Sequence, residues 1–128
     1  MALGERLGAA LSRGSVVLLI GPLGAGKTVL AKGMARGLGI QEGISSPTYT
    51  IISEYHGKGV TLYHVDLYRI EGRDQVENLG LDDILRGDSI TVVEWGEKLE
   101  PLDVAHARIS VALAPDGGRD ILVEERAT

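Results

Sequence analysis

The chain has 128 residues, a length typical of a single domain, and its 44% hydrophobic and 24% charged residues exclude intrinsic disorder as the default state. It contains no cysteine, which excludes disulfides, thiolate metal sites and cysteine catalysis and predicts a reducing, cytoplasmic compartment. Its formal net charge of −5 argues against stand-alone nucleic-acid binding, because such a chain repels phosphate backbones on average.

The N-terminal third predicts a helix, a buried strand and a second helix. Leucines at four-residue spacing indicate a helix over residues 2–12, and an apolar run between two glycines indicates a central strand over residues 15–20. This stretch contains the longest aliphatic run, which is far shorter than the ~20 residues that span a bilayer. Apolar residues at helical spacing predict the second helix over residues 28–38, with Gly39 just past its C-terminus.

The rest of the chain predicts mostly strands. Two runs rich in β-branched residues, 49–55 and 60–65, flank a glycine-rich break and are typical of an antiparallel hairpin. Residues 73–86 are charged and amphipathic, as expected of one or two short helices. The remaining predicted strands cover residues 90–95, 108–113 and 121–124. A strand–helix unit combined with hairpins indicates an α/β fold whose sheet is only partly parallel.

A glycine-rich loop joins the first predicted strand to the second helix. Its sequence, Gly21-Pro22-Leu23-Gly24-Ala25-Gly26-Lys27-Thr28, matches G-x-x-x-x-G-K-[ST] at every fixed position. The glycines let backbone N–H groups turn inward around a phosphate, and the helix N-terminus presents further donors. Lys27 can reach the β- and γ-phosphates, and the Thr28 hydroxyl is a hard oxygen ligand for Mg²⁺. We therefore expect a nucleoside-triphosphate site that uses Gly21, Leu23, Gly24, Ala25, Gly26, Lys27 and Thr28.

Two acids are candidates for holding the metal. A phosphate loop needs a carboxylate at the end of a neighbouring strand to hold Mg²⁺, directly or through water. Glu94 closes the β-branched run 90–93, and Asp66 closes the run 61–65. Ligands in open α/β sheets gather at the carboxyl ends of strands, so both acids can face the loop. The residues alone leave open which of the two ligates the metal directly.

Other polar and aromatic residues have plainer interpretations. Alternation along its strand makes His64 a packed, hydrogen-bonded core residue rather than a metal ligand. Trp95 is the sole tryptophan and, taken alone, is more typical of a core than of a ligand contact. Lys32 and Arg36 lie four residues apart on the predicted second helix and indicate a solvated face.

With these motifs located, the sequence resembles the TsaE family (formerly YjeE), P-loop ATPases of tRNA threonylcarbamoyladenosine biosynthesis. The resemblance covers roughly residues 3–113 and rests on Leu23-Gly24-Ala25-Gly26-Lys27-Thr28, Ser46-Pro47-Thr48-Tyr49-Thr50, His64-Val65-Asp66-Leu67-Tyr68-Arg69, Leu79-Gly80-Leu81 and Val93-Glu94-Trp95. It implies a P-loop NTPase-like three-layer sandwich with a mixed parallel and antiparallel central sheet. We expect residues 1–128 to form a single ATPase domain, without the strand that precedes the first helix in the family.

The resemblance also implies roles for the loop and the acids. Lys27 and the loop backbone would bind the triphosphate, and Thr28 and Glu94 would ligate Mg²⁺. Asp66 would be an essential acid near the γ-phosphate and a second candidate metal ligand. Proteins of this family hydrolyse ATP slowly, chiefly when their partners are present, and assist the TsaD and TsaB proteins. Contact with tRNA would therefore be indirect, through that complex, which agrees with the acidic net charge.

The resemblance assigns two further residues to the site. Trp95 would be a site-adjacent aromatic residue, which reverses the preference for a core position. Thr48 would lie in a switch-like segment that senses the nucleotide. Residues 44–50 are rich in hydroxyls, and Pro47 favours extended geometry at the residue before it, so we expect a nucleotide-dependent switch that controls partner binding.

Other functions fit the same loop. A small P-loop metabolite kinase would need a lid that supplies arginines over the phosphates, and only Arg69 and Arg73 follow Asp66 locally. A GTPase would need Asn-Lys-x-Asp, but the sole asparagine, Asn78, is followed by Leu79. A nucleotide-gated protein-binding module with incidental hydrolysis is the non-enzymatic alternative.

Overall fold

The computed structural model describes residues 2–22, 26–41, 51–57 and 59–127, in which six strands form one sheet of order β2-β3-β4-β1-β5-β6. The strands are β1 (Val16–Ile20), β2 (Ile52–His56), β3 (Thr61–Asp66), β4 (Ile90–Glu94), β5 (His106–Leu113) and β6 (Arg119–Arg126). The helices are α1 (Ala2–Ala9), α2 (Lys27–Gly37), α3 (Arg73–Glu77), α4 (Leu81–Leu85) and the 3-10 helix η1 (Gly96–Leu99).

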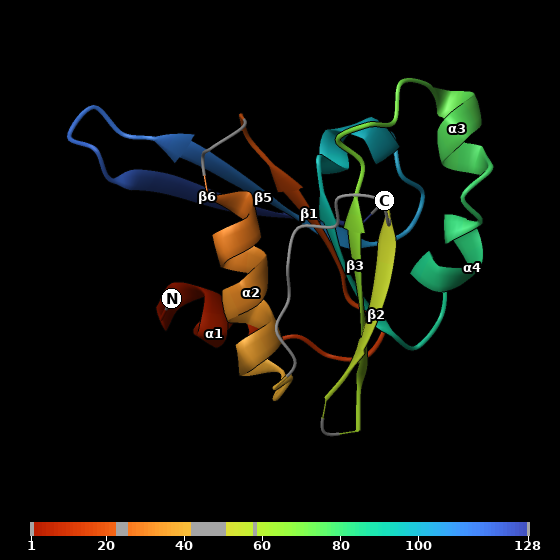
Figure 1. Cartoon of the computed structure of the whole chain (residues 1–128), viewed down its shortest axis with the longest axis horizontal. Coiled ribbons are helices and arrows are strands. Elements are labelled where there is room, and N and C mark those ends of the chain that lie inside the picture. The colour runs from red at the N-terminus through yellow and green to blue at the C-terminus, as the bar shows by residue number, and fades with distance from the viewer. Residues whose placement is uncertain (1, 23–25, 42–50, 58, 128) are drawn as a thin grey trace.

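The sheet is mixed, as the sequence predicts. β3, β4, β1 and β5 are parallel neighbours, whereas β2 pairs antiparallel with β3 and β6 pairs antiparallel with β5. The β2–β3 pair is the predicted hairpin, and the β5–β6 pair joins the last two predicted strands; each pair contributes one edge strand. The β5–β6 hairpin extends well beyond the other strands (Figure 1). Because the central strands are parallel, their carboxyl ends meet at one edge of the sheet.

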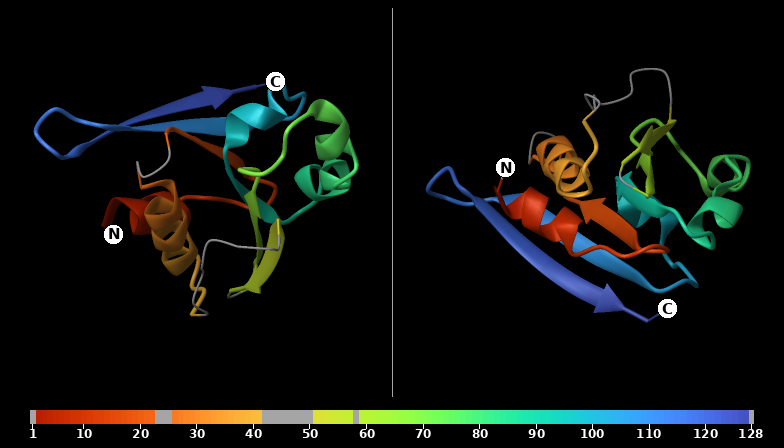
Figure 2. Two further views of the ribbon diagram at one scale, coloured as in Figure 1. Left: turned by 45° about the horizontal axis from the view of Figure 1, so that its top comes forward. Right: turned by 90° about the horizontal axis from the view of Figure 1, so that it is seen from below.

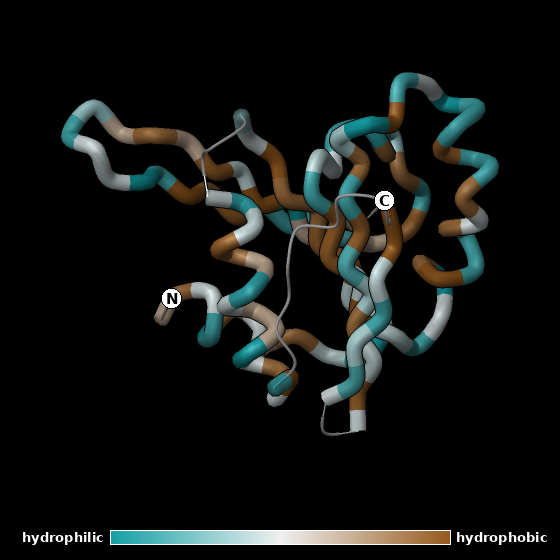
Figure 3. The backbone as a smooth tube through the Cα atoms, in the orientation of Figure 1, coloured by the Kyte–Doolittle hydropathy of each residue, from teal (hydrophilic) through white to brown (hydrophobic). Residues whose placement is uncertain are grey.

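Helices cover both faces of this sheet, which makes the predicted three layers. α1 and α2 lie together on one side and α3 and α4 on the other (Figures 1 and 2). Side chains alternate along β1, so that Val17 and Leu19 join the core under α2, while Val16 and Leu18 join the core under α4 and η1. β1, which is buried on both faces, is accordingly a continuous run of hydrophobic residues (Figure 3).

The first helix is shorter than its leucine spacing predicts. α1 ends at Ala9, and the chain then turns, with the backbone N–H of Ser12 donating to Ser15 Oγ at 3.1 Å. Leu11 still packs against the core, which explains why the apolar spacing continues past the helix. Gly8 lets α1 approach α2 closely, because a Cβ on Gly8 would lie 2.0 Å from the carbonyl oxygen of Met34.

The remaining boundaries agree with the sequence to within a few residues, except at the last hairpin. β6 covers Arg119–Arg126, twice the predicted length, and pairs along its whole length with β5. Most of its residues are charged or exposed, so only a short part of the strand has a hydrophobic pattern. Residues 49 and 50, where a strand is predicted, lie outside the described residues. Within the described ranges, none of the helices has the length and apolar character needed to cross a membrane.

Candidate nucleotide site

The carboxyl ends of β1, β3 and β4 meet beside the N-terminus of α2. In the sheet register, Glu94 of β4 pairs with Leu19 of β1 on one side and with Asp66 of β3 on the other. Alternation gives Asp66 and Glu94 the same face as Leu62 and Ile90, which belong to the core under α2. The two predicted acids are therefore neighbours, and both point towards the side of the sheet where α2 begins.

The glycine loop connects β1 to α2, as predicted. Gly21 has a φ of +151°, and a Cβ at this position would lie 2.2 Å from the carbonyl oxygen of Val111, so glycine is required there on both counts. Gly26 caps α2 with a φ of +103°, and the helix starts at Lys27. The predicted binding residues Leu23, Gly24 and Ala25 lie outside the described residues.

Lys27 is held at the start of α2. Its side chain is 4% exposed, and Nζ donates a hydrogen bond of 2.6 Å to the carbonyl oxygen of Gly21. The same ammonium lies 3.3 Å from the ring centroid of Trp95, a cation–π contact. Burial lowers the pKa of Lys27, and the charges of nearby carboxylates, Glu97 foremost, oppose that shift. The lysine that sequence analysis assigns to the outer phosphates is thus stabilised by the loop and by the tryptophan.

Glu94 is the centre of a buried polar network. It is 3% exposed, Thr28 Oγ1 donates to its Oε1 at 2.7 Å, and His64 Nε2 lies 2.6 Å from its Oε2. Burial alone would raise the pKa of Glu94, but the hydrogen bonds from His64 and Thr28 and the charge of Lys27 lower it overall. The arrangement therefore favours the ionised carboxylate, the form that binds a divalent cation.

Asp66 and Trp95 complete the surroundings of this network. Asp66 is half-buried, and its Oδ1 accepts a hydrogen bond of 3.0 Å from the backbone N–H of Tyr68. Trp95 follows Glu94 with a φ of +60°, a conformation of order 1–3 kcal/mol less favourable for a residue with a side chain. Its ring lies 5.3 Å from that of Tyr68 as well as against Lys27. The tryptophan is therefore half-buried: it packs against the core under α4 and η1, and its ring also contacts Lys27.

The donor set fits Mg²⁺. Thr28, Glu94 and Asp66 offer only hard oxygen atoms, which Mg²⁺ prefers. Within the described part of the chain, no group of three His, Asp or Glu side chains forms a metal cluster. Mg²⁺ is usually held by one or two carboxylates together with substrate phosphates rather than by an all-protein cage. These residues therefore suit a magnesium ion that binds together with a nucleotide.

Two residues near the site have no signal in the sequence. Lys98 Nζ donates to the carbonyl oxygens of Leu67, Tyr68 and Ile70 at 3.0, 2.9 and 2.8 Å, which fixes the backbone that follows Asp66. Arg119 of the β5–β6 hairpin approaches the glycine loop, since its Nε is 3.4 Å from where a Cβ on Gly26 would lie. Both depend on contacts between segments far apart in the chain.

Some of the other predicted residues are described by the structure, and some are not. His64 is fully buried and hydrogen-bonded, as predicted, but its partner is the candidate metal ligand. Lys32 and Arg36 are exposed on α2, as predicted. Thr48 and the expected switch over residues 44–50 lie outside the described residues.

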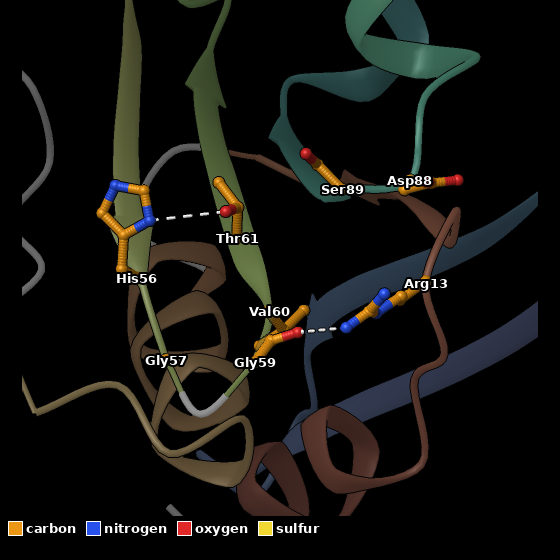
Figure 4. A pocket seen from close by; sticks show the side chains of 8 residues that line it. All are labelled: Arg13, His56, Gly57, Gly59, Val60, Thr61, Asp88 and Ser89. Carbon is orange, nitrogen blue, oxygen red and sulfur yellow. Dashed lines mark hydrogen bonds between the residues drawn. The ribbon is translucent and has the colours of Figure 1, made fainter.

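A hollow lies at the opposite edge of the sheet, where β1, β3 and β4 begin (Figure 4). Its volume is about 400 Å³, and its lining includes Arg13, His56, Thr61 and Ser89. Arg13 Nη2 donates to the carbonyl oxygen of Gly59 at 2.8 Å, and His56 Nδ1 lies 3.4 Å from Thr61 Oγ1. Both contacts are solvent-exposed, in contrast to the buried polar pairs around Glu94.

The comparison with known proteins agrees with these features. The profile of the family described as "Threonylcarbamoyl adenosine biosynthesis protein TsaE" matches residues 1–121. The tRNA threonylcarbamoyladenosine biosynthesis protein TsaE of Treponema pallidum (strain Nichols) is 44% identical over 121 residues, which cover 94% of this chain and 89% of that protein. The chain belongs to the TsaE family.

Further relatives support the TsaE assignment. The tRNA threonylcarbamoyladenosine biosynthesis protein TsaE of Bacillus subtilis (strain 168) is 45% identical over 109 residues, 84% of this chain and 68% of that protein. The crystal structure of Bacillus subtilis YdiB matches the fold with a TM-score of 0.77 at 34% identity, over 99% of this chain and 78% of that chain. The predicted family and fold class are therefore confirmed, and the TsaE family acts in tRNA threonylcarbamoyladenosine biosynthesis. The roles of the individual site residues stay predictions.

Proposed function

We propose that this chain binds ATP and Mg²⁺ at residues 21–28, hydrolyses the ATP slowly, and thereby supports TsaD and TsaB in forming threonylcarbamoyladenosine in tRNA in the cytoplasm. The observation that carries the proposal is the hydrogen bond of 2.7 Å from Thr28 Oγ1 to Glu94 Oε1. It joins the hydroxyl of a phosphate loop to the carboxylate at the end of a neighbouring parallel strand. In P-loop NTPases these two groups together hold the magnesium ion of the nucleotide.

The loop and the helix that follows it would bind the triphosphate. The N-terminal N–H groups of α2 have no acceptor within the helix and lie at the positive end of its dipole, which favours an anion there. Lys27 adds a positive charge that can move from the carbonyl oxygen of Gly21 to a phosphate oxygen. Because Lys27 is buried, its ammonium would interact with phosphate more strongly than a solvated lysine.

Thr28 and Glu94 would hold Mg²⁺, with Asp66 as a second acid beside them. When bound, this ion would neutralise charge on the phosphate oxygens. Asp66 lies one strand away from Glu94 at the same level of the sheet, and it is half-buried rather than fully enclosed. We assign Asp66 to orienting the attacking water, a role that needs contact with solvent, and Glu94 to the metal.

The partner proteins explain how a small chain of this charge could serve tRNA modification. The net charge of −5 makes this chain poorly suited to grip tRNA directly. TsaE family membership supports the tRNA modification pathway, and TsaD and TsaB would supply the contact with tRNA.

The decisive experiment measures ATP turnover by the purified chain with and without purified TsaD and TsaB. We expect slow turnover by the chain alone, stimulation by the partners, and loss of turnover in Asp66→Asn with ATP binding retained. Asp88→Asn, an exposed acid at the opposite edge, serves as the matched control. Nucleotide-dependent binding to TsaD and TsaB without turnover would favour the protein-binding module instead. No ATP binding at all would contradict the proposal.

A further inference from the structure

His64 is the most completely enclosed polar residue around the site. It lies in β3, pairs in register with Val92 of β4, and reaches diagonally to Glu94, two residues further along that strand. The distance from His64 Nε2 to Glu94 Oε2 is 2.6 Å, and the two side chains are 1% and 4% exposed. A contact this short and this dry is a strong, charge-assisted hydrogen bond.

The two carboxylate oxygens of Glu94 have different partners. Oε2 faces His64 on β3, and Oε1 accepts the hydrogen bond from Thr28 on α2. A carboxylate with one free end can rotate about its terminal bond and can bind a cation with one oxygen or with both. With Oε2 held by an imidazole, rotation is blocked and Oε1 is the oxygen turned towards the phosphate loop.

The surroundings of His64 Nδ1 indicate which of the two ring nitrogens carries the hydrogen. His64 Nδ1 is buried and has no hydrogen-bond partner among the described residues. Burying an unpaired N–H donor costs free energy, and a bare Nδ1 avoids burying a donor without an acceptor. The geometry therefore favours the tautomer in which Nε2 carries the hydrogen and donates it to Glu94.

We propose that His64 is a positioning residue for the magnesium site: it donates to Glu94 Oε2 and so fixes Glu94 with Oε1 presented to Thr28 and the metal. This inference rests on the proposed function, because it concerns the same site. Neighbours that orient a metal ligand are commonly worth roughly 10–100-fold in metal affinity or activity. The role is absent from the plainer interpretation of His64 as a core residue, which predicts a change in stability only.

Two substitutions separate positioning from packing. His64→Leu keeps an apolar side chain of similar size and removes the donor, whereas His64→Gln keeps an N–H donor that can reach Glu94 Oε2. Leu62→Ala is the matched control, since Leu62 lies on the same strand and the same face and is buried but has no polar role.

The experiment is a magnesium titration of ATP binding, followed by calorimetry, with ATP binding in EDTA measured alongside. We expect His64→Leu to raise the magnesium concentration needed for half-maximal enhancement roughly 10–100-fold, with ATP affinity in EDTA within about 2-fold of wild type. His64→Gln should recover most of the loss. Leu62→Ala should lower the melting temperature and leave the magnesium dependence unchanged.

A second measurement uses the wild-type chain, so it does not depend on a variant that folds. His64 donates through Nε2, whereas His106, the other buried histidine, contacts the carbonyl oxygen of Val104 at 2.8 Å and so donates through Nδ1. Long-range ¹⁵N–¹H spectra distinguish the two tautomers. We expect one slowly exchanging Nε2–H signal that shifts when Mg²⁺ and ATP are added, with the Nδ1–H signal of His106 as an internal reference.

Each outcome has a distinct meaning. If wild type shows no magnesium-dependent ATP binding, the proposed function itself fails. If wild type binds and His64→Leu has the same magnesium dependence, or Leu62→Ala loses as much, the positioning role of His64 is overturned while the proposed function stands. A missing Nε2–H signal, or one that ignores Mg²⁺ and ATP, would also overturn it.

Discussion

The carboxyl and amino edges of the central sheet, where its parallel strands end and begin, carry similar kinds of residue but bury them to different extents. At the carboxyl edge, Lys27, His64 and Glu94 are almost fully buried. Glu94 is hydrogen-bonded to His64 at 2.6 Å and to Thr28 at 2.7 Å, and Lys27 donates to the carbonyl oxygen of Gly21 at 2.6 Å. At the amino edge, His56 pairs with Glu54 at 3.1 Å, with side chains that are 65% and 47% exposed. The amino edge has the open hollow of Figure 4, whereas the carboxyl edge, among the described residues, holds Lys27 and Glu94 away from water.

The difference between the two edges lies in how far their charged groups are removed from water. Removing an ion from water is unfavourable by several kcal/mol unless partners compensate. The buried Lys27 and Glu94 therefore depend on their hydrogen-bond partners to stay in the folded chain. Exposed ion pairs contribute only about 0–1 kcal/mol. The carboxyl edge is therefore where substitutions should have large and specific effects.

The largest effect is expected from Glu94→Gln. The substitution keeps the shape of the side chain but removes the charge that Thr28 and His64 contact and that would bind Mg²⁺ in the proposed site. ATP turnover should fall by roughly 10²–10³-fold, the usual effect of losing a preorganised charge contact, while the circular dichroism spectrum is retained. Asp88→Asn at the amino edge should turn over at the wild-type rate. An equal loss of ATP turnover in both variants would contradict the prediction that the carboxyl edge is the more sensitive one.

A smaller effect is expected from Lys27→Ala. One charge-assisted hydrogen bond to a phosphate is worth roughly 1.5–3 kcal/mol, so ATP affinity should fall by about 10–100-fold. ADP should lose less, because Lys27 is expected to reach the outer phosphates. Lys32→Ala, an exposed lysine on the same helix, is the control and should bind both nucleotides normally. Calorimetry with equal losses for ATP and ADP would contradict the assignment.

The pH dependence of stability should distinguish the edges as well. Because the pKa of Glu94 is lowered in the folded chain, ionised Glu94 stabilises the fold fully above its ordinary value near 4.5, and this contribution is lost as the pH falls below that value. Without Mg²⁺ or nucleotide, the stability advantage of wild type over Glu94→Gln should shrink between pH 6 and pH 3. Thermal melts in which the two chains lose stability in parallel would show that the network around Glu94 has no such effect.

The smallest expected effect is optical. Trp95 is the sole tryptophan and contacts the ammonium of Lys27, so moving Lys27 onto a phosphate changes the charge beside the indole ring. Its fluorescence should change when ATP is added and should change much less in Lys27→Ala at ATP concentrations that still saturate that variant. An unchanged spectrum in saturated wild type would mean that Lys27 does not leave the ring when nucleotide binds.

Local patterns alone determine the mixed α/β fold, the position of the glycine loop and the two strand-end acids. The loop matches the spacing of a phosphate-binding turn at every fixed position. The hydrophobic runs that end at Asp66 and Glu94 indicate buried strands. Hairpins are equally readable, because their strands are neighbours in the chain. The end of α1 cannot be read from the leucine spacing, since Leu11 packs against the core from beyond the helix.

Only the tertiary structure decides which of these residues meet. The order β3-β4-β1 brings Asp66, Glu94 and the loop together, although they are separated by long stretches of chain. The bond between His64 and Glu94 depends on the register of two parallel strands, and the approach of Arg119 to Gly26 depends on the path of a distant hairpin. Periodicity records whether a side chain is buried, but its hydrogen-bond partner is set by strand order and register, which arise from packing of the whole sheet against its helices.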